Sequence, residues 1–486
     1  MKFLDNEQRS QIGFNFLMEE LQTITFYGIE EKKKIKTYKR CEKDILIEGF
    51  DNLEKVINSI KNNDNDFKKI SRLLMRVKDI KNSIKRAMNN EVLDEVELYE
   101  IKYFSMIVED LKIIVDGLNL EIEELNLDQL NDVLEILDPD NKRLSTFYIY
   151  DSYSEKLKDI RKRKSEIEKR IFGSSDEETI ARLKEDRLLI VIEEENEELK
   201  IRRTLTSKIC NYGKSILKNM ECIGKLDFII AKAMMAIKYN AVRPKIINNM
   251  EIKFVDAFNP EVKSILSKQN KVFTSQTIDL KKGTTVITGA NMGGKSVTLK
   301  TIVLNLLLGQ MGFFVFAKEA CFPILDFIHF ISDDMQSISK GLSTFGAEII
   351  KLKEVVECAK RGDGFIALDE FARGTNPKEG FYLVKSVALY LNKMNSISLI
   401  STHYDGVVEE NMEHYQVVGL KNMNFNNLKF KIDLNKTKSV EIIQEHMEYR
   451  IEKVSRENKV PKDALNIAML LGLDSEIVDI AKEYYK

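Results

Sequence analysis

Apolar residues recur at helical spacing through the first part of the chain. Runs of apolar positions three and four apart place these side chains on one face of a helix. Pro139 is the only proline before Pro244, and glycine is sparse before Gly283. Because proline and glycine interrupt helices, this stretch favours long helices. We therefore predict a helical core domain over residues 1–150. Its apolar positions include Leu17, Leu21, Ile24, Leu53, Val56, Ile57, Ile60, Ile70, Leu73, Leu74, Val77 and Ile80.

A more highly charged helical pattern covers residues 151–243 and predicts lever helices with a short helical hairpin. An apolar seam runs to about residue 171, the turn 173–176 offers Asp176 as an N-cap, and a second helix returns over 180–205. Acidic runs at 193–195 and 197–198 face a basic cluster. The pattern favours two solvated faces that compensate each other, and contact with nucleic acid stays open. The cluster consists of Lys156, Lys158, Arg161, Lys162, Arg163 and Lys164.

From residue 244 onward, short apolar strands alternate with helices. This alternation is typical of an α/β domain with a parallel sheet. We therefore predict an α/β domain over residues 244–486. The whole chain is then multidomain, with an α-helical core and lever helices ahead of the sheet.

The strand 284–288 leads into the most specific motif of the chain. Residues 289–296 fit G-x-x-x-x-G-K-[ST], the phosphate-binding P-loop. In this motif backbone N–H groups surround the β-phosphate, the lysine adds charge near the β/γ oxygens, and the final hydroxyl binds Mg²⁺. The preceding strand and the following helix supply a context that a chance glycine turn lacks. We expect Lys295 to lie on a solvated loop. The predicted binding segment contains Gly289, Asn291, Met292, Gly293, Gly294, Lys295, Ser296 and Val297.

Two acids follow another apolar strand, 365–368. Strands of a parallel sheet deliver the residues at their carboxyl ends to one edge, so Asp369 and Glu370 should lie beside the phosphate loop. Phosphoryl transfer needs charge neutralisation and a positioned water more than covalent catalysis. We predict that Asp369, with Ser296, holds Mg²⁺ and that Glu370 orients and deprotonates the attacking water.

Two further places could complete the site. His403 follows the strand 396–401, where it could sense the γ-phosphate or bond the attacking water, although a histidine at a strand end is often only structural. The small-residue turn 341–348 opens a helix and has an anion-binding shape. Taken alone, that turn is more typical of a helix cap.

The composition narrows the setting without naming a partner. The 75 lysines and arginines nearly balance 77 acids, which does not indicate a nucleic-acid binder, although a local basic face is compatible with it. The five cysteines form no C-x-x-C pair, which favours reduced thiols. The N-terminus lacks the apolar core of a signal peptide, and no apolar run is long enough to span a bilayer. We predict a cytoplasmic protein without membrane contact.

Four motifs together resemble the ATPase domain of the MutS family. They are TGANMGGKS (288–296), GLSTF (341–345), LDEFARGT (368–375) and STHY (401–404), in the family's order and spacing. Residues 226–244 resemble the end of the family's lever helix, and 464–482 resemble its C-terminal helical dimerisation motif. Asn259-Pro260 departs from the usual Arg-His-Pro, and Ala290 replaces a usual proline.

The resemblance implies a Mg²⁺-dependent ATP hydrolase of the ABC type whose site is shared across a dimer. The dimer could be a homodimer or a heterodimer with a MutS-like partner. Lys295, Glu370 and the two metal ligands would act within one chain, and Ser343 would approach the γ-phosphate in the opposite site. By the same comparison Asn291 lies near the γ-phosphate, His403 is the switch histidine and Phe273 stacks on adenine. The implied catalytic residues are Glu370, His403 and Lys295.

The client of such an ATPase is left open by the sequence. Mismatch-reading members carry an N-terminal sheet domain with a wedge, whereas the helical pattern here begins near Met1, so we expect no mismatch reader. We also expect no C-terminal nuclease domain like that of the second bacterial MutS branch. One function is ATP-coupled lever motion on DNA, resembling mismatch repair, with weak and non-specific binding. The alternative is an ATP-driven chaperone or reactivator of a protein client, such as a cobalamin-dependent aminomutase. A nucleotide-binding dimer without turnover is disfavoured by the intact Glu370.

Overall fold

The structure is a computed structural model that describes residues 3–144, 148–289, 293–332, 344–420, 446–454 and 463–484. It divides into two compact units. Unit 1 comprises Met1–Gln22, Lys36–Glu54 and Met234–Lys486, and unit 2 comprises Thr23–Ile35 and Lys55–Ala233. The units do not follow the predicted boundaries at residues 150 and 243, because the first stretches of the chain belong with the sheets.

Unit 2 is helical, as predicted for the first part of the chain. Asp94 illustrates how its helices begin: the carboxylate accepts the N–H of Glu97 at 2.8 Å, and the Glu97 side chain accepts the N–H of Asp94 at 3.0 Å. This capping box satisfies two amides that have no partner within the helix. The elements of unit 2 are α3 (Phe26–Lys33), α5 (Asp64–Leu74), α6 (Lys81–Met88), α7 (Glu95–Gly117), η2 (Glu123–Leu125), α8 (Asn131–Leu137), η3 (Asp151–Tyr153), α9 (Glu155–Gly173) and α10 (Glu177–Cys210). The unit boundaries also fall within α4 (Lys43–Asn62) and α11 (Gly213–Tyr239).

The predicted helical run through Leu17, Leu21 and Ile24 is interrupted in the structure. Leu21 is the C-cap of α2 (Phe14–Glu20), and α3 begins only after the N-cap Thr25. Within unit 2, the N–H groups of Ile24 and Thr25 donate to the buried carboxylate of Asp227, at 2.9 and 2.6 Å. These charge-assisted bonds offer the backbone an alternative to helix, which the apolar spacing alone does not reveal.

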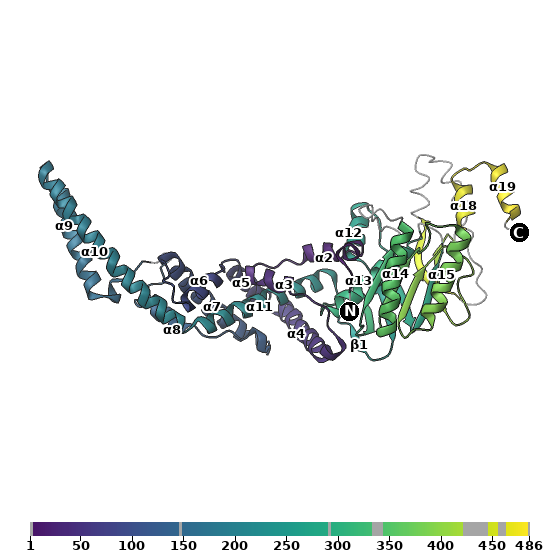
Figure 1. The fold of residues 1–486 in the computed structure, drawn as a ribbon, viewed down its shortest axis with the longest axis horizontal. Helices are drawn as coiled ribbons and strands as arrows, with labels where there is room; N and C mark the ends of the chain where they lie inside the picture. The colour runs from purple at the N-terminus through teal and green to yellow at the C-terminus, as the bar shows by residue number, and fades with distance from the viewer. Residues whose placement is uncertain are drawn as a thin grey trace. The chain divides into compact units, whose positions relative to one another are not determined.

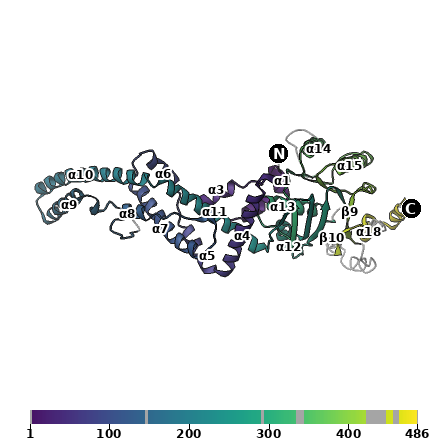
Figure 2. The same ribbon diagram turned by 90° about the horizontal axis from the view of Figure 1, so that it is seen from below.

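The predicted hairpin is confirmed. Helices α9 and α10 lie side by side in both views (Figures 1 and 2). Asp176 caps α10 as predicted, since its carboxylate accepts the N–H of Thr179 at 3.0 Å. The returning helix is longer than expected and continues to Cys210.

Unit 1 contains the α/β domain, and Figure 1 shows α13, α14 and α15 alongside its strands. The smaller sheet has the strand order β1-β5-β2-β3, and the larger has the order β10-β9-β4-β8-β7-β6. In the larger sheet every neighbouring pair is parallel except β10 with β9. The strands are β1 (Lys245–Ile247), β2 (Glu251–Ala257), β3 (Gln276–Lys281), β4 (Gly283–Thr288), β5 (Glu319–Pro323), β6 (Ile328–Ser332), β7 (Phe365–Asp369), β8 (Ile397–Ser401), β9 (Glu413–Gly419) and β10 (Glu448–Lys453).

Helices and short N-terminal segments surround these sheets. Asn259, where the family has histidine, caps α12: its side chain accepts the N–H of Glu261 at 3.1 Å and donates to the carbonyl of Ile12 at 3.0 Å. The short helix α1 is held against β6, because Gln8 Nε2 donates to the Phe330 carbonyl and Ser332 Oγ donates to Gln11 Oε1 at 3.1 Å. The remaining elements of unit 1 are α1 (Asn6–Gln11), α2, η1 (Arg40–Glu42), α12 (Pro260–Lys268), α13 (Lys295–Gln310), α14 (Thr344–Arg361), α15 (Pro377–Asn392), α18 (Asp463–Leu470) and α19 (Ser475–Tyr484).

Candidate active site

Three adjacent strand ends gather the predicted residues at one edge of the larger sheet. Strand β4 pairs in parallel with β8, and β8 pairs in parallel with β7. The registers place Ser401 opposite both Ile287 and Asp369. The turn after β4, the acids at the end of β7 and the polar residues at the end of β8 therefore lie at the same edge of the sheet, as expected for the carboxyl ends of parallel strands.

Lys295, at the start of α13, points back across the turn. Its Nζ donates to the carbonyl of Gly289 at 2.8 Å and lies 3.3 Å from Glu370 Oε1. The expectation of a solvated lysine was wrong, because the side chain is only 2% exposed. Burial lowers the pKa of Lys295, and the neighbouring carboxylate of Glu370 opposes that shift. The lysine charge is thus held away from solvent by the Gly289 carbonyl and the Glu370 carboxylate, whose places phosphate oxygens could take.

Asp369 accepts two hydroxyl groups on the same carboxylate oxygen. Ser296 Oγ donates to its Oδ1 at 3.0 Å, and Ser401 Oγ donates to it at 2.6 Å. Burial raises the pKa of Asp369, while the hydrogen bonds from Ser401 and Ser296 pull it down. A carboxylate and a hydroxyl at this separation are the hard oxygen donors that Mg²⁺ prefers. The residue pair therefore fits a magnesium ion, which would offset the cost of the buried negative charge.

Glu370 lies on a turn with an unusual backbone. Its φ is +46°, and that of Ala372 is +60°, both in the left-handed region that L-residues with a Cβ rarely adopt. The Glu370 N–H donates to Ser401 Oγ at 3.1 Å, and Arg373 Nη1 lies 2.7 Å from Glu370 Oε2. The carboxylate is therefore held between Lys295 and Arg373. Left-handed backbone outside glycine concentrates at functional sites, which supports a role for this turn.

His403 follows β8 and packs its ring against Tyr404, with 4.2 Å between the ring centroids. Desolvation lowers the pKa of His403, and Glu370 opposes the shift. The neutral imidazole is then the main form near neutral pH, and its ring nitrogens include an acceptor.

The two glycines at the ends of the turn have positive φ and little room for a side chain. Gly289 has φ +136°, and a Cβ there would lie 3.0 Å from Val417 Cβ. Gly294 has φ +84°, and a Cβ there would lie 3.2 Å from the ring of Tyr449 on β10. Both positions thus favour glycine for its backbone conformation, and a side chain would also require the neighbouring residue to shift.

Several predicted residues are not placed by this geometry. Ala290, Asn291, Met292 and Ser343 lie outside the described residues, so their predicted roles stay predictions. Phe273 is half-buried in the coil before β3. On that strand Gln276 Nε2 donates to the carbonyl of Tyr449 at 3.0 Å, and so Phe273 precedes a strand that is tied to the rim of the turn. Its predicted stacking on adenine also stays a prediction.

Sequence reasoning missed residues that support the site. Ser401 bridges Asp369 and the Glu370 amide, Arg373 pairs with Glu370, and Tyr449 covers Gly294. Ser401 and Arg373 stand inside the STHY and LDEFARGT motifs, and this position is the signal that could have found them. Tyr449 lies far along the chain from the turn and carries no comparable signal.

Most side chains of the hairpin's basic cluster are engaged in ion pairs with acidic residues of the same unit. Arg161 pairs with Asp151, with Glu194 at 3.1 Å and with Glu198 at 2.8 Å, and Arg163 lies 2.7 Å from Glu193. The prediction of mutually compensating faces is confirmed for these residues. The hairpin therefore offers less positive charge to nucleic acid than its sequence suggests.

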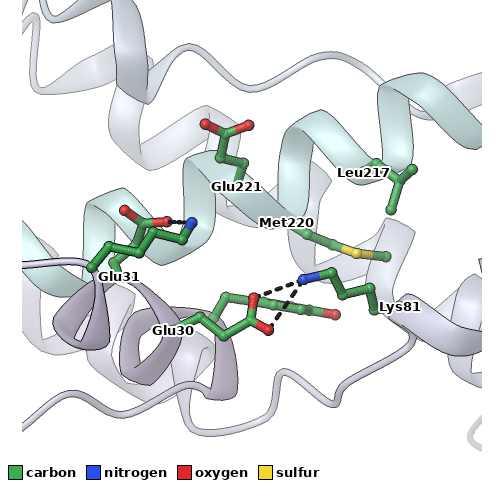
Figure 3. Close-up of a pocket in the computed structure, with 8 residues that line it drawn as sticks. Glu30, Glu31, Lys81, Leu217, Met220 and Glu221 are labelled. Atoms are coloured by element: carbon green, nitrogen blue, oxygen red, sulfur yellow. Dashed lines mark hydrogen bonds and ion pairs between the residues drawn. The ribbon is translucent and has the colours of Figure 1, made fainter.

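A separate pocket of about 220 Å³ lies within unit 2 (Figure 3). Lys81 Nζ lies 2.8 Å from Glu30 Oε2, and Lys34 Nζ lies 2.5 Å from Glu31 Oε1. Because both lysines of the lining are already paired with its carboxylates, we assign no ligand to this pocket.

Across the described residues, no helix has the length and apolar content needed to cross a membrane.

The fold and this edge define the protein as a mixed helical and α/β protein with a candidate phosphate site at the ends of parallel strands. Comparison with known proteins shows which family this part of the chain resembles. Residues 285–485 match the family model for MutS domain V. The chain is 34% identical over 216 residues to "Endonuclease MutS2" of Levilactobacillus brevis, covering 44% of this chain and 27% of that protein. It is 30% identical over 292 residues to the protein of that name from Carboxydothermus hydrogenoformans, covering 59% of this chain and 34% of the relative.

A longer match reaches the helical part. The chain is 26% identical over 463 residues to "Endonuclease MutS2" of Caldanaerobacter subterraneus subsp. tengcongensis, covering 84% of this chain. The chain is therefore similar to members of the MutS family, and the match is most specific over residues 285–485. It spans between 27% and 56% of the length of these relatives.

Proposed function

We propose that this chain binds ATP with Mg²⁺ at residues 289–297 and hydrolyses the ATP, with Glu370 as the general base. The observation that carries the proposal is the convergence of two pairs at one sheet edge. Ser296 Oγ lies 3.0 Å from Asp369 Oδ1, and Lys295 Nζ lies 3.3 Å from Glu370 Oε1. Phosphoryl transfer by P-loop proteins needs this set: a lysine, a hydroxyl, a metal-binding carboxylate and a group that orients water. The match to MutS domain V supports the same assignment.

Each residue has a distinct part in the proposed reaction. Ser296 and Asp369 would hold Mg²⁺, and the bound ion neutralises phosphate charge. Lys295 exchanges its contacts with the Gly289 carbonyl and Glu370 for phosphate oxygens. Glu370, freed from the lysine and still held by Arg373, orients a water and accepts its proton. His403, with its lowered pKa, can accept a hydrogen bond as the neutral imidazole.

We further propose that a second MutS-like chain completes the site through Ser343 and that the nucleotide state drives lever motion on DNA. The relatives reported above support a DNA-associated role, since each is named an endonuclease. The ion pairs of the hairpin favour weak DNA binding, because they already occupy Arg161 and Arg163. Binding through the DNA backbone alone would be salt-sensitive and sequence-blind. Neither the relatives nor the site supports the protein-client alternative.

The test is ATP turnover and ATP binding by the Glu370→Gln variant. We expect turnover to fall by at least about 100-fold, the lower end of what a general base contributes. ATP should remain bound, because the lysine and the metal ligands are retained. Glu379→Gln, the same change at an exposed position on α15, is the matched control and should behave as the parent. Parental turnover in Glu370→Gln would remove Glu370 from the role of base.

A further inference from the structure

A buried carboxylate joins α14 to the turn that carries Glu370. Glu348 is only 1% exposed, on the first turns of α14. Its Oε2 accepts the backbone N–H of Ala372 at 2.9 Å. Burying an ionisable side chain is costly unless it is hydrogen-bonded, so this contact fixes how α14 and the turn meet.

The bond acts on a backbone that would otherwise relax. Ala372 has φ +60° and Glu370 has φ +46°, so two residues of one short turn hold a conformation that their side chains disfavour. Such conformations persist only where the surroundings over-determine them. Glu348 supplies the hydrogen bond on one side of the turn.

Helix α15 closes the other side. A Cβ at Gly380 would lie 2.9 Å from the Ala372 carbonyl, so the helix backbone passes directly against the turn. Phe371 is 2% exposed and Ala372 is fully buried in the core that α14 and α15 share. The turn is therefore clamped at its N–H by Glu348 and at its carbonyl by the α15 backbone.

We propose that Glu348 is a positioning residue for Glu370. This inference rests on the proposed function, in which Glu370 is the general base. Helix α14 carries Glu348, and the hydrogen bond to the Ala372 N–H joins that helix to the turn of the catalytic acid. The placement of Glu370 thus depends on a buried side chain from a different element of the fold.

The test compares Glu348→Ala, Glu348→Gln and Glu354→Gln in the full chain with ATP and Mg²⁺. Glu348→Ala removes the acceptor, and we expect kcat to fall by at least about tenfold, since small misplacements of catalytic groups carry such costs. The affinity for ATP should stay within twofold, because the phosphate turn is untouched. Glu348→Gln keeps an oxygen acceptor and should recover most of kcat. Glu354 lies exposed on the same helix, so Glu354→Gln should match the parent.

A double variant distinguishes positioning from general damage. Glycine adopts positive φ without penalty, so adding Ala372→Gly to Glu348→Ala should restore part of kcat if the clamp serves to hold this backbone. Parental kcat in Glu348→Ala overturns the proposal, as does an equal loss of ATP affinity and kcat in Glu348→Gln. If the parent chain itself binds no ATP, the proposed function fails instead. The two failures are therefore distinguishable.

Discussion

Two serines on β8 allow the contribution of the site's hydrogen bonds to stability to be tested, because the same serine-to-alanine change can be made at both. Ser401 and Ser398 are both fully buried on the same strand. The hydroxyl of Ser401 donates to Asp369 Oδ1 at 2.6 Å and accepts the N–H of Glu370 at 3.1 Å. The hydroxyl of Ser398 has no hydrogen-bond partner among the described residues. Serine to alanine therefore removes two contacts at one position and none at the other.

The expected effects have different signs. A hydrogen bond to a charged group contributes about 1.5–3 kcal/mol, so Ser401→Ala should lower the free energy of unfolding by about that amount. The Glu370 amide keeps a second acceptor, the Ser401 carbonyl at 3.1 Å, which limits the further loss. The Ser398 hydroxyl loses its hydrogen bonds to water on folding and gains none within the described residues. Ser398→Ala should therefore leave the free energy of unfolding unchanged or raise it by up to about 1 kcal/mol.

Urea titration followed by far-UV circular dichroism measures both values, and hydrogen exchange of β8 amides localises them. The chain has no tryptophan, so circular dichroism is preferable to intrinsic fluorescence. Equal destabilisation by both variants, or a larger loss in Ser398→Ala, would refute the assignment of the two hydroxyls.

Three further predictions concern the ligands. Lys295→Ala should weaken ATP binding by at least about tenfold, or 1.4 kcal/mol, because it removes the charge near the β/γ oxygens. Calorimetric titration measures this affinity, and Lys282→Ala, at an exposed lysine, is the control. Unchanged affinity in Lys295→Ala would argue against the phosphate site. Glu370→Gln should dimerise only with ATP and Mg²⁺ in sedimentation velocity, and a monomer in both conditions beside an active parent would exclude a composite site. DNA binding should fall steeply with salt and should not distinguish mismatched from matched duplex in competition assays; a mismatch bound ten times more tightly, about 1.4 kcal/mol, would contradict this.

Much of the site was predictable because strand ends follow a general rule. Parallel strands bring their carboxyl ends to one edge, so the apolar runs before Asp369 and His403, together with the glycine motif that ends at Ser296, could assign these residues to one neighbourhood. The hairpin was predictable for a similar reason, since a local apolar seam and an N-cap at Asp176 specify it without distant contacts.

The remainder depends on contacts that local patterns do not contain. Lys295 is buried beside Glu370, which lies far along the chain, whereas motif chemistry alone suggested a solvated lysine. Helix α2 ends at its C-cap Leu21, and the N–H of Ile24 shortly after it donates to the carboxylate of Asp227, 203 positions further along the chain. Positive φ at Glu370 and Ala372 has no signal in residue type, because neither is glycine. Long-range polar contacts of this kind override local propensity.

The attachment of α1 to β6 bears on how the protein is made. Gln8 donates to the carbonyl of Phe330, 322 positions later, and Gln11 accepts from Ser332, 321 positions later. At about 5–20 residues per second, roughly 16–64 s pass on the ribosome before the acceptor for Gln8 exists. Closing so long a loop also slows the step itself. Helix α1 is thus synthesised well before the strand that it contacts, and its apolar residues can be covered by β6 only after that strand has been translated.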